Sequence, residues 1–282
     1  MNDYRNLKVR NFFNGTAREF VRNKILASDM NLKEGEFDAF GADLDVLTDT
    51  FTVLLFFYKF YFRVEVHGIE NVPSEGPGLI VSNHAPILPI DAMMIGVSGV
   101  VEGENPRIGR AIVNKHISSI PYFSTWMSRA GQVIGCDENA RRIFQEGKIM
   151  LVFPTGAEGD IHSIFNKYEV AEFPIGFMEY ALRYRTPIIP TCVTGSEEAA
   201  MTLGKLDLPV GGFKHFPITP IFPWLGILGL VPFPSKINIY YGEPVDYFTD
   251  HGGEVNDPAK VRILVDDLRE KIVAMLDEAL GR

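Results

Sequence analysis

The sequence has little of several features that would point to particular kinds of protein. It contains only two cysteines in 282 residues, Cys136 and Cys192, and they lie far apart without the spacing of metal ligands. Its amino-terminal residues also lack the run of small apolar side chains that forms a secretory signal. We therefore expect a protein of the reducing cytoplasm that binds no metal.

Patterns that mark other classes of enzyme are missing as well. The sequence has no G-x-S-x-G nucleophile elbow, no G-x-x-x-x-G-K-[ST] phosphate loop and no H-E-x-x-H metal pattern. It has little excess of basic charge, since its net charge is −9 and its pI is about 5.2. Because nucleic-acid binding normally needs a basic surface, we expect no nucleic-acid partner.

A long uninterrupted hydrophobic run is also lacking. The apolar stretch from Phe51 to Phe62 is interrupted by Lys59 and is shorter than the roughly 20 residues of a membrane-spanning helix, so it predicts a buried or interfacial helix. A second stretch, from Phe216 to Pro234, contains five prolines, which exclude a regular spanning helix. We interpret it as a hydrophobic loop, either packed on the core or exposed beside a site. The loop's large apolar residues are Trp224, Leu225, Ile227, Leu228 and Leu230.

Basic charge is concentrated at the amino terminus. Residues 1–25 carry six basic and only two acidic side chains, interleaved with aromatic and aliphatic residues. Such a segment is typical of an amphipathic helix that lies on an anionic membrane, which would place the protein at the inner face of the cell membrane. The alternative is a helix that docks on the core, and Gly15 with Thr16 can split the segment in two.

The rest of the chain alternates β-branched runs with helical patterns, which predicts an α/β layer fold. We expect one domain over residues 51–282, preceded by a helical extension over residues 1–50. The predicted strands are Phe62–Val66, Gly78–Val81, Ile108–Val113, Ile149–Phe153, Pro187–Val193 and Lys236–Tyr241. The predicted helices are Ile90–Gly96, Tyr122–Ala130, Glu138–Glu146, Pro174–Tyr184 and Pro258–Leu280.

The residues most suggestive of chemistry follow the predicted strand Gly78–Val81. There the chain runs directly into a polar turn with Asn83 and His84, and Asp91 follows seven residues after the histidine. Sites in α/β sheets form at strand ends, and a histidine there can act as a general base if an aspartate orients it. The alternative is a capping arrangement at the start of a helix, with no catalytic role.

Several blocks resemble, in order and spacing, the glycerolipid acyltransferases of the bacterial phosphatidic-acid-forming type. The resemblance covers about Phe62 to Asp246. Its blocks are Asn83-His84 to Asp91, Phe153-Pro154-Thr155-Gly156, Thr186-Pro187-Ile188-Ile189-Pro190, Gly195-Ser196-Glu197-Glu198, Phe222-Pro223-Trp224-Leu225-Gly226 and Gly242-Glu243-Pro244.

This resemblance implies a glycerol-phosphate-acyltransferase-like fold with a mixed, mostly parallel sheet flanked by helices. It implies that His84 and Asp91 activate an acceptor hydroxyl for direct attack on an acyl thioester, without a covalent acyl-enzyme. The donor would be acyl-CoA or acyl-carrier protein, with no further cofactor, and the acceptor 1-acyl-glycerol-3-phosphate. The resemblance assigns substrate binding to Asn83, Phe153, Pro154, Thr155 and Gly156.

Three positions depart from the family pattern. Six residues separate His84 from Asp91 where four are usual, and Thr155 stands where the family has a glutamate that helps to build the acceptor site. Glu158 is a possible substitute for that glutamate. Cys136 stands where the family often carries an arginine, and the phosphate-binding replacements to consider are Lys115, Arg110, Arg141 and Lys167.

These departures leave two alternatives open. One is an acyltransferase for a neutral lipid alcohol such as diacylglycerol, and the other is a catalytically silent lipid-binding relative. The two cysteines are also possible acyl-accepting nucleophiles, although Cys192 lies in an apolar run that predicts simple burial.

Overall fold

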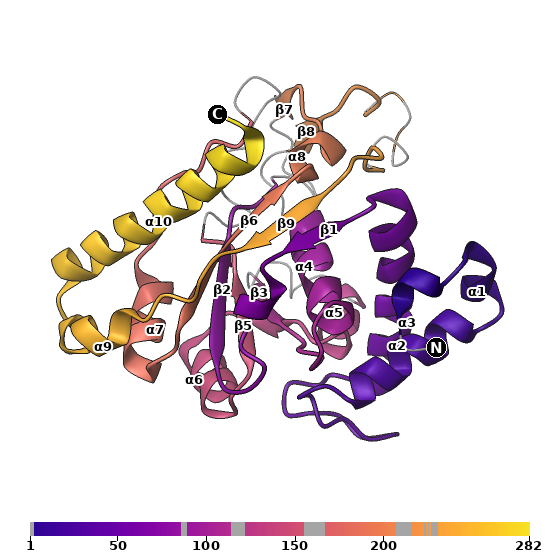
Figure 1. The fold of residues 1–282 in the computed structure, drawn as a ribbon, viewed down its shortest axis with the longest axis horizontal. Helices are drawn as coiled ribbons and strands as arrows, with labels where there is room; N and C mark the ends of the chain where they lie inside the picture. Colours follow the sequence, from indigo (N-terminus) through magenta and orange to yellow (C-terminus); the bar gives the residue numbers. More distant parts are fainter. Residues whose placement is uncertain are drawn as a thin grey trace.

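A computed structural model of the chain shows a seven-stranded sheet with helices on both faces (Figure 1). The structure describes residues 3–85, 89–113, 122–154, 167–206, 216–222, 224, 226 and 231–282. The strand order is β1-β9-β6-β2-β5-β3-β4, and every neighbouring pair is parallel except β6 with β9. The predicted α/β fold with a mixed, mostly parallel sheet is therefore confirmed.

The elements follow the predicted ones closely. The strands are β1 (Glu65–His67), β2 (Gly78–Ser82), β3 (Arg110–Val113), β4 (Val133–Ile134), β5 (Ile149–Val152), β6 (Ile188–Thr194) and β9 (Asn238–Tyr241), and a separate pair is formed by β7 (Gly204–Leu206) and β8 (Phe216–Ile218). The helices are α1 (Val9–Phe13), α2 (Thr16–Leu26), α3 (Leu44–Phe56), α4 (Ile90–Val101), α5 (Phe123–Arg129), α6 (Asp137–Gln145), α7 (Gly176–Tyr184), α8 (Ser196–Ala199), α9 (Tyr247–His251) and α10 (Pro258–Leu280). The elements missed from the sequence, β4, β7, β8, α8 and α9, are too short to show a period.

Strand β2 lies at the centre of the sheet and is buried on both faces. Leu79 and Val81 belong to the buried cluster beneath α6, α7 and α10, whereas Ile80 belongs to the cluster beneath α3 and α4. Successive side chains of a strand point to opposite faces, so an unbroken apolar run is what a parallel sheet covered on both sides requires. This packing fixes the position at which the chain leaves β2 and enters the predicted site.

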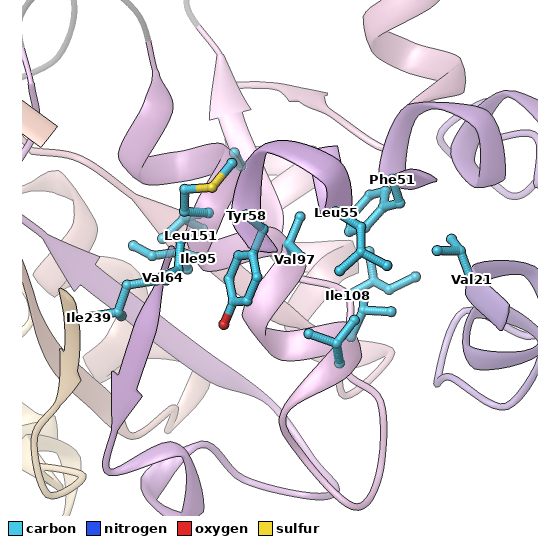
Figure 2. Close-up of a cluster of buried hydrophobic side chains, with 14 of the residues drawn as sticks. Val21, Phe51, Leu55, Tyr58, Val64, Ile95, Val97, Ile108, Leu151 and Ile239 are labelled. Atoms are coloured by element: carbon cyan, nitrogen blue, oxygen red, sulfur yellow. The ribbon is translucent and has the colours of Figure 1, made fainter. Parts of the chain in front are cut away.

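The basic amino-terminal segment is divided at Asn14 and Gly15, between α1 and α2. In α2, the apolar residues Ala17, Phe20, Val21 and Ile25 are buried, and Figure 2 shows Val21 in the same cluster as Phe51 and Leu55 of α3. The core-docking alternative therefore holds for α2. Helix α1 differs, since its Phe13 is 84% exposed.

The apolar run that predicted a buried helix forms α3, which begins at Leu44 rather than at Phe51. The carboxylate of Asp43 accepts a hydrogen bond from the backbone N–H of Val46, and this cap starts the helix early. Residue 50, where we placed the end of the amino-terminal extension, thus lies inside α3.

Lys59, which interrupts the apolar run, lies in the π-helical turn Phe57–Tyr61 that continues α3. Its Nζ donates to the carbonyl oxygens of Tyr4, Arg5 and Leu7 at 3.0, 2.6 and 2.6 Å. The lysine therefore holds the 3-10 turn Tyr4–Asn6 and the following Leu7 against the end of α3. Within the described ranges, no helix is both long enough and apolar enough to span a bilayer.

The predicted hydrophobic loop is described only in part. The side chain of Trp224 is exposed, whereas Leu225, Ile227, Leu228 and Leu230 lie outside the described residues. At this one position, the exposure of Trp224 agrees with the interpretation that the loop is exposed rather than packed on the core.

Candidate active site

His84 and Asp91 lie together at the carboxyl end of β2. His84 follows the strand by two residues, and Asp91 is in the first turn of α4. The imidazole Nδ1 lies 3.0 Å from both carboxylate oxygens, Oδ1 and Oδ2. The six-residue spacing therefore still pairs the two side chains, although residues 86–88 between them lie outside the described residues.

The carboxylate of Asp91 is held by the backbone as well as by His84. Its Oδ2 accepts from the N–H of Ala85 at 2.6 Å and its Oδ1 accepts from the N–H of Ala92 at 2.8 Å, and the side chain is wholly buried. An acidic group in the first turn of a helix is also favoured by the helix dipole. The geometry is therefore compatible with both alternatives considered from the sequence, since Asp91 accepts from one N–H at the start of α4 and also lies against the histidine.

This arrangement assigns the two ring nitrogens different roles. A carboxylate accepts hydrogen bonds only, so Nδ1 of His84 carries the proton and donates it to Asp91. Nε2 has no hydrogen-bond partner among the described residues and is left as the basic nitrogen. The geometry is that of a general base with an orienting carboxylate.

The electrostatics of the pair favour proton uptake by the imidazole. The side chain of His84 is only 14% exposed, and burial by itself lowers its pKa. The charge of Asp91 and its hydrogen bond to Nδ1 outweigh burial, so the pKa of His84 is raised above its ordinary value. Protonation of the His84 imidazole is thereby favoured.

Two further predicted residues adjoin this pair. The ring of Phe153, directly after β5, lies 4.6 Å from the His84 ring at a tilt of 36°. The amide of Asn83 donates from Nδ2 to the carbonyl of Val193 at 3.0 Å and accepts at Oδ1 from the Val193 N–H at 2.8 Å. Asn83 thus ties the end of β2 to β6, which positions the backbone that carries His84.

The other predicted substrate-binding residues are only partly placed. Pro154 follows Phe153 in a turn at the carboxyl end of β5. Lys115, Thr155, Gly156 and Glu158 lie outside the described residues. Their predicted contribution to substrate binding stays a prediction.

Three of the four cations considered as phosphate ligands have other partners. Arg110 is buried, forms an ion pair with Asp38 and lies over the ring of Phe40 at 4.6 Å. Arg141 pairs with Glu138 on α6, and Lys167 pairs with Glu198 at 3.2 Å. These charges are therefore compensated within the fold.

The cysteines differ in their surroundings. Cys192 is fully buried on β6, and burial raises the pKa of its thiol to about 12. A thiol that remains protonated is a poor nucleophile, which agrees with its prediction as a buried apolar side chain. Cys136 is exposed immediately before α6.

The sequence analysis singled out the block that contains Glu197 and Glu198 but did not predict that Tyr168 binds both glutamates. Tyr168 lies 29 and 30 residues before the two glutamates, and no spacing rule connects them. The one available signal was the pair of adjacent acidic residues directly after the apolar run of β6.

Comparison with known proteins finds a family match over part of the chain. The acyltransferase family model matches residues 63–194. An uncharacterised protein of Mycobacterium tuberculosis is 37% identical over 234 residues, which is 81% of this chain and 65% of that protein. A Bos taurus protein named "DGAT1/2-independent enzyme synthesizing storage lipids" is 28% identical over 218 residues, covering 76% of this chain and 59% of that protein. The chain thus spans less than two thirds of the length of these relatives.

Among solved structures, the chain is similar to the 1-acyl-sn-glycerophosphate (LPA) acyltransferase PlsC of Thermotoga maritima. The TM-score is 0.52 at 18% sequence identity, and the match covers 95% of this chain and 97% of that one. This likeness concerns the fold, and the family match covers the strands and helices that carry His84, Asp91 and Phe153. Over residues 63–194, the chain is similar to the acyltransferase family.

Proposed function

We propose that this protein is an O-acyltransferase that moves a fatty acyl group from an acyl thioester to the hydroxyl of a lipid. The observation that carries the proposal is the His84–Asp91 pair, with Nδ1 held and Nε2 available. Nε2 takes the proton of the acceptor hydroxyl as its oxygen attacks the thioester carbonyl. The carbon–sulfur bond then breaks, and the imidazolium returns the proton to the leaving thiolate.

We propose a neutral lipid alcohol such as diacylglycerol as the acceptor, in preference to 1-acyl-glycerol-3-phosphate. Arg110 is buried in an ion pair with Asp38 and is therefore a poor candidate for binding a phosphate, and the more exposed Arg141 and Lys167 are paired with Glu138 and Glu198. Thr155 in place of the family's glutamate points the same way. The Bos taurus relative named for storage-lipid synthesis is a further reason to test neutral acceptors.

The acceptor is tested by measuring thiol release from acyl-CoA by purified protein in mixed micelles. We expect diacylglycerol to stimulate thiol release roughly tenfold or more over a control without acceptor. The reason is that a bound and oriented hydroxyl attacks the thioester faster than water does. A preference for 1-acyl-glycerol-3-phosphate in direct competition would contradict the neutral acceptor and restore the phosphatidic-acid-forming role. Acyl-carrier protein serves as the second donor. Lipid binding without turnover of either thioester would favour the silent lipid-binding alternative.

We further propose that α1 attaches the protein to the inner face of the cell membrane. Val9 and Phe13 are exposed on this helix, and Val53 of α3 is exposed as well. Lys8 and Arg10 supply positive charge beside them, whereas Arg18 and Arg22 of α2 are paired with acidic residues. Exposed apolar side chains beside cations that have no ion-pair partner among the described residues are suited to an anionic lipid surface.

Replacing Phe13 with serine should weaken binding to vesicles of anionic phospholipid. A buried phenylalanine contributes about 1.5–3 kcal/mol, so the partition coefficient should fall roughly tenfold or more. Sedimentation of the protein with vesicles measures this change. The matched control is Ile263→Ser on α10, which removes another exposed apolar side chain, 66% exposed, and should leave binding unchanged. Equal binding by the wild type and Phe13→Ser would refute the proposed role of α1.

A further inference from the structure

A compact group of side chains lies at the carboxyl end of β6, outside the His84–Asp91 pair. The backbone N–H of Tyr168 donates to Glu197 Oε1 at 2.9 Å, and the Tyr168 hydroxyl donates to Glu198 Oε2. The same hydroxyl accepts from the N–H of Gly195 at 2.7 Å. One residue is thus bound at both its backbone and its side chain by the turn from β6 into α8.

The turn from β6 into α8, which binds Tyr168, is fixed by contacts of its own. Gly195 has a φ of +87°, and a Cβ at this position would lie 2.0 Å from the carbonyl oxygen of Lys236. Its own carbonyl accepts from the Ser235 hydroxyl at 2.8 Å. Tyr168 also has a positive φ, of 61°, which is costly for a residue with a large side chain. A conformation of this kind persists only where its surroundings determine it.

The position of this group relative to His84 follows from the strand order. Strand β2, which carries His84, lies between β5 and β6. Phe153 follows β5 and contacts His84 from one flank, whereas Tyr168 is held at the carboxyl end of β6 on the other flank. Asn83 binds Val193 of β6, two residues before Gly195. Phe153 and Tyr168 therefore lie on opposite flanks of the candidate base His84.

We infer that Tyr168, held by Glu197 and Glu198, is a positioning residue that fixes the β6 side of the site and thereby sets the affinity for the acceptor lipid. The inference rests on the proposed acyl transfer. Tyr168 does not contact the His84–Asp91 pair in any described interaction, so its loss should change the KM for the acceptor more than kcat. Its burial raises the pKa of the phenol, helped by the hydrogen bond to Glu198, so the hydroxyl remains a donor throughout the neutral range.

The experiment compares Tyr168→Phe and Glu198→Gln with the wild type. We expect each variant to raise the acceptor KM roughly tenfold, the factor that one hydrogen bond to a charged group is worth, with less than about a twofold change in kcat. Both substitutions weaken the bond between Tyr168 and Glu198, so the double variant should lose less than the sum of the two single losses. Each also has an effect of its own, since Tyr168→Phe leaves the Gly195 N–H without its acceptor and Glu198→Gln removes the ion pair with Lys167.

The matched control is Tyr247→Phe. Tyr247 is 7% exposed and donates to Asp267 Oδ2 at 2.5 Å, while Tyr168 is 8% exposed. Both substitutions remove a tyrosine–carboxylate bond of similar burial, but Tyr247 lies in α9, far from α8 in Figure 1. Both substitutions should lower the melting temperature. Only Tyr168→Phe should raise the acceptor KM.

An unchanged acceptor KM in Tyr168→Phe, or an equal rise in Tyr247→Phe, would overturn the inference while leaving acyl transfer intact. A wild type that transfers no acyl group to any acceptor would overturn the proposed function instead. In that case, the role of Tyr168 is tested by equilibrium binding of dioctanoylglycerol, which needs no turnover. Weaker binding by Tyr168→Phe than by the wild type supports the positioning role, and equal affinities refute it.

Discussion

Replacing His84 with alanine is expected to reduce acyl transfer by roughly 10³-fold or more, because positioned general bases contribute about 10²–10⁴-fold and no other described group is placed to replace this one. His84 is the only described imidazole with a carboxylate fixed at its Nδ1 by two backbone N–H groups. Thiol release at saturating donor and acceptor measures the loss. Circular dichroism and thermal unfolding of the variant check that it is folded, because the substitution removes the contacts of His84 with Phe153 and Asp91.

The matched control for His84 is His67 on β1. Its ring stacks on Tyr240 with centroids 4.6 Å apart, the same separation as between His84 and Phe153. His67→Ala therefore removes an imidazole with a comparable ring contact but no fixed carboxylate, and it should retain activity within about twofold. Near wild-type transfer by a folded His84→Ala variant would exclude the general-base mechanism.

Replacing Asp91 with asparagine should lower the rate and move its pH dependence to lower pH. A general base is active only when neutral, so kcat/KM rises with pH through the pKa of His84 in the free enzyme. In the wild type, Asp91 holds that pKa above the ordinary value despite burial, so the acidic limb lies above about 6.5. Without the charge, burial alone acts on the imidazole, and the limb should lie below that value.

The expected loss for Asp91→Asn in the pH-independent region is roughly 10²–10⁴-fold, because the correct tautomer and the imidazolium lose their support. Asp257→Asn is the matched control, since this carboxylate accepts from the N–H groups of Ala259 and Lys260 at the start of α10 without contacting a histidine. Asp257→Asn changes helix capping alone, so the pH dependence of kcat/KM should remain that of the wild type. An acidic limb that does not move in Asp91→Asn would contradict the assigned pairing.

The contrast between α10 and the amino-terminal segment shows where sequence reasoning succeeds. The predicted limits of α10, Pro258 and Leu280, are those of the structure, because its apolar period, the Asp257 cap and the terminal Gly281 all lie within one segment. Residues 1–25 also have an amphipathic pattern, but a pattern does not name the surface that an apolar face meets. Packing decided that α2 docks on α3 and that Phe13 of α1 is exposed.

The candidate site divides in the same way. The sequence by itself determined the apolar strand β2, the polar turn with His84 at its end, and the family blocks around Phe153 and Gly195, because these depend on residue type and local order. Only the tertiary structure decided that Asp91 reaches His84 across six residues, that Arg110 pairs with Asp38, and that Tyr168 binds Glu197 and Glu198. Those contacts join segments whose separation is set by how helices pack on the sheet, and a linear pattern carries no information on that distance.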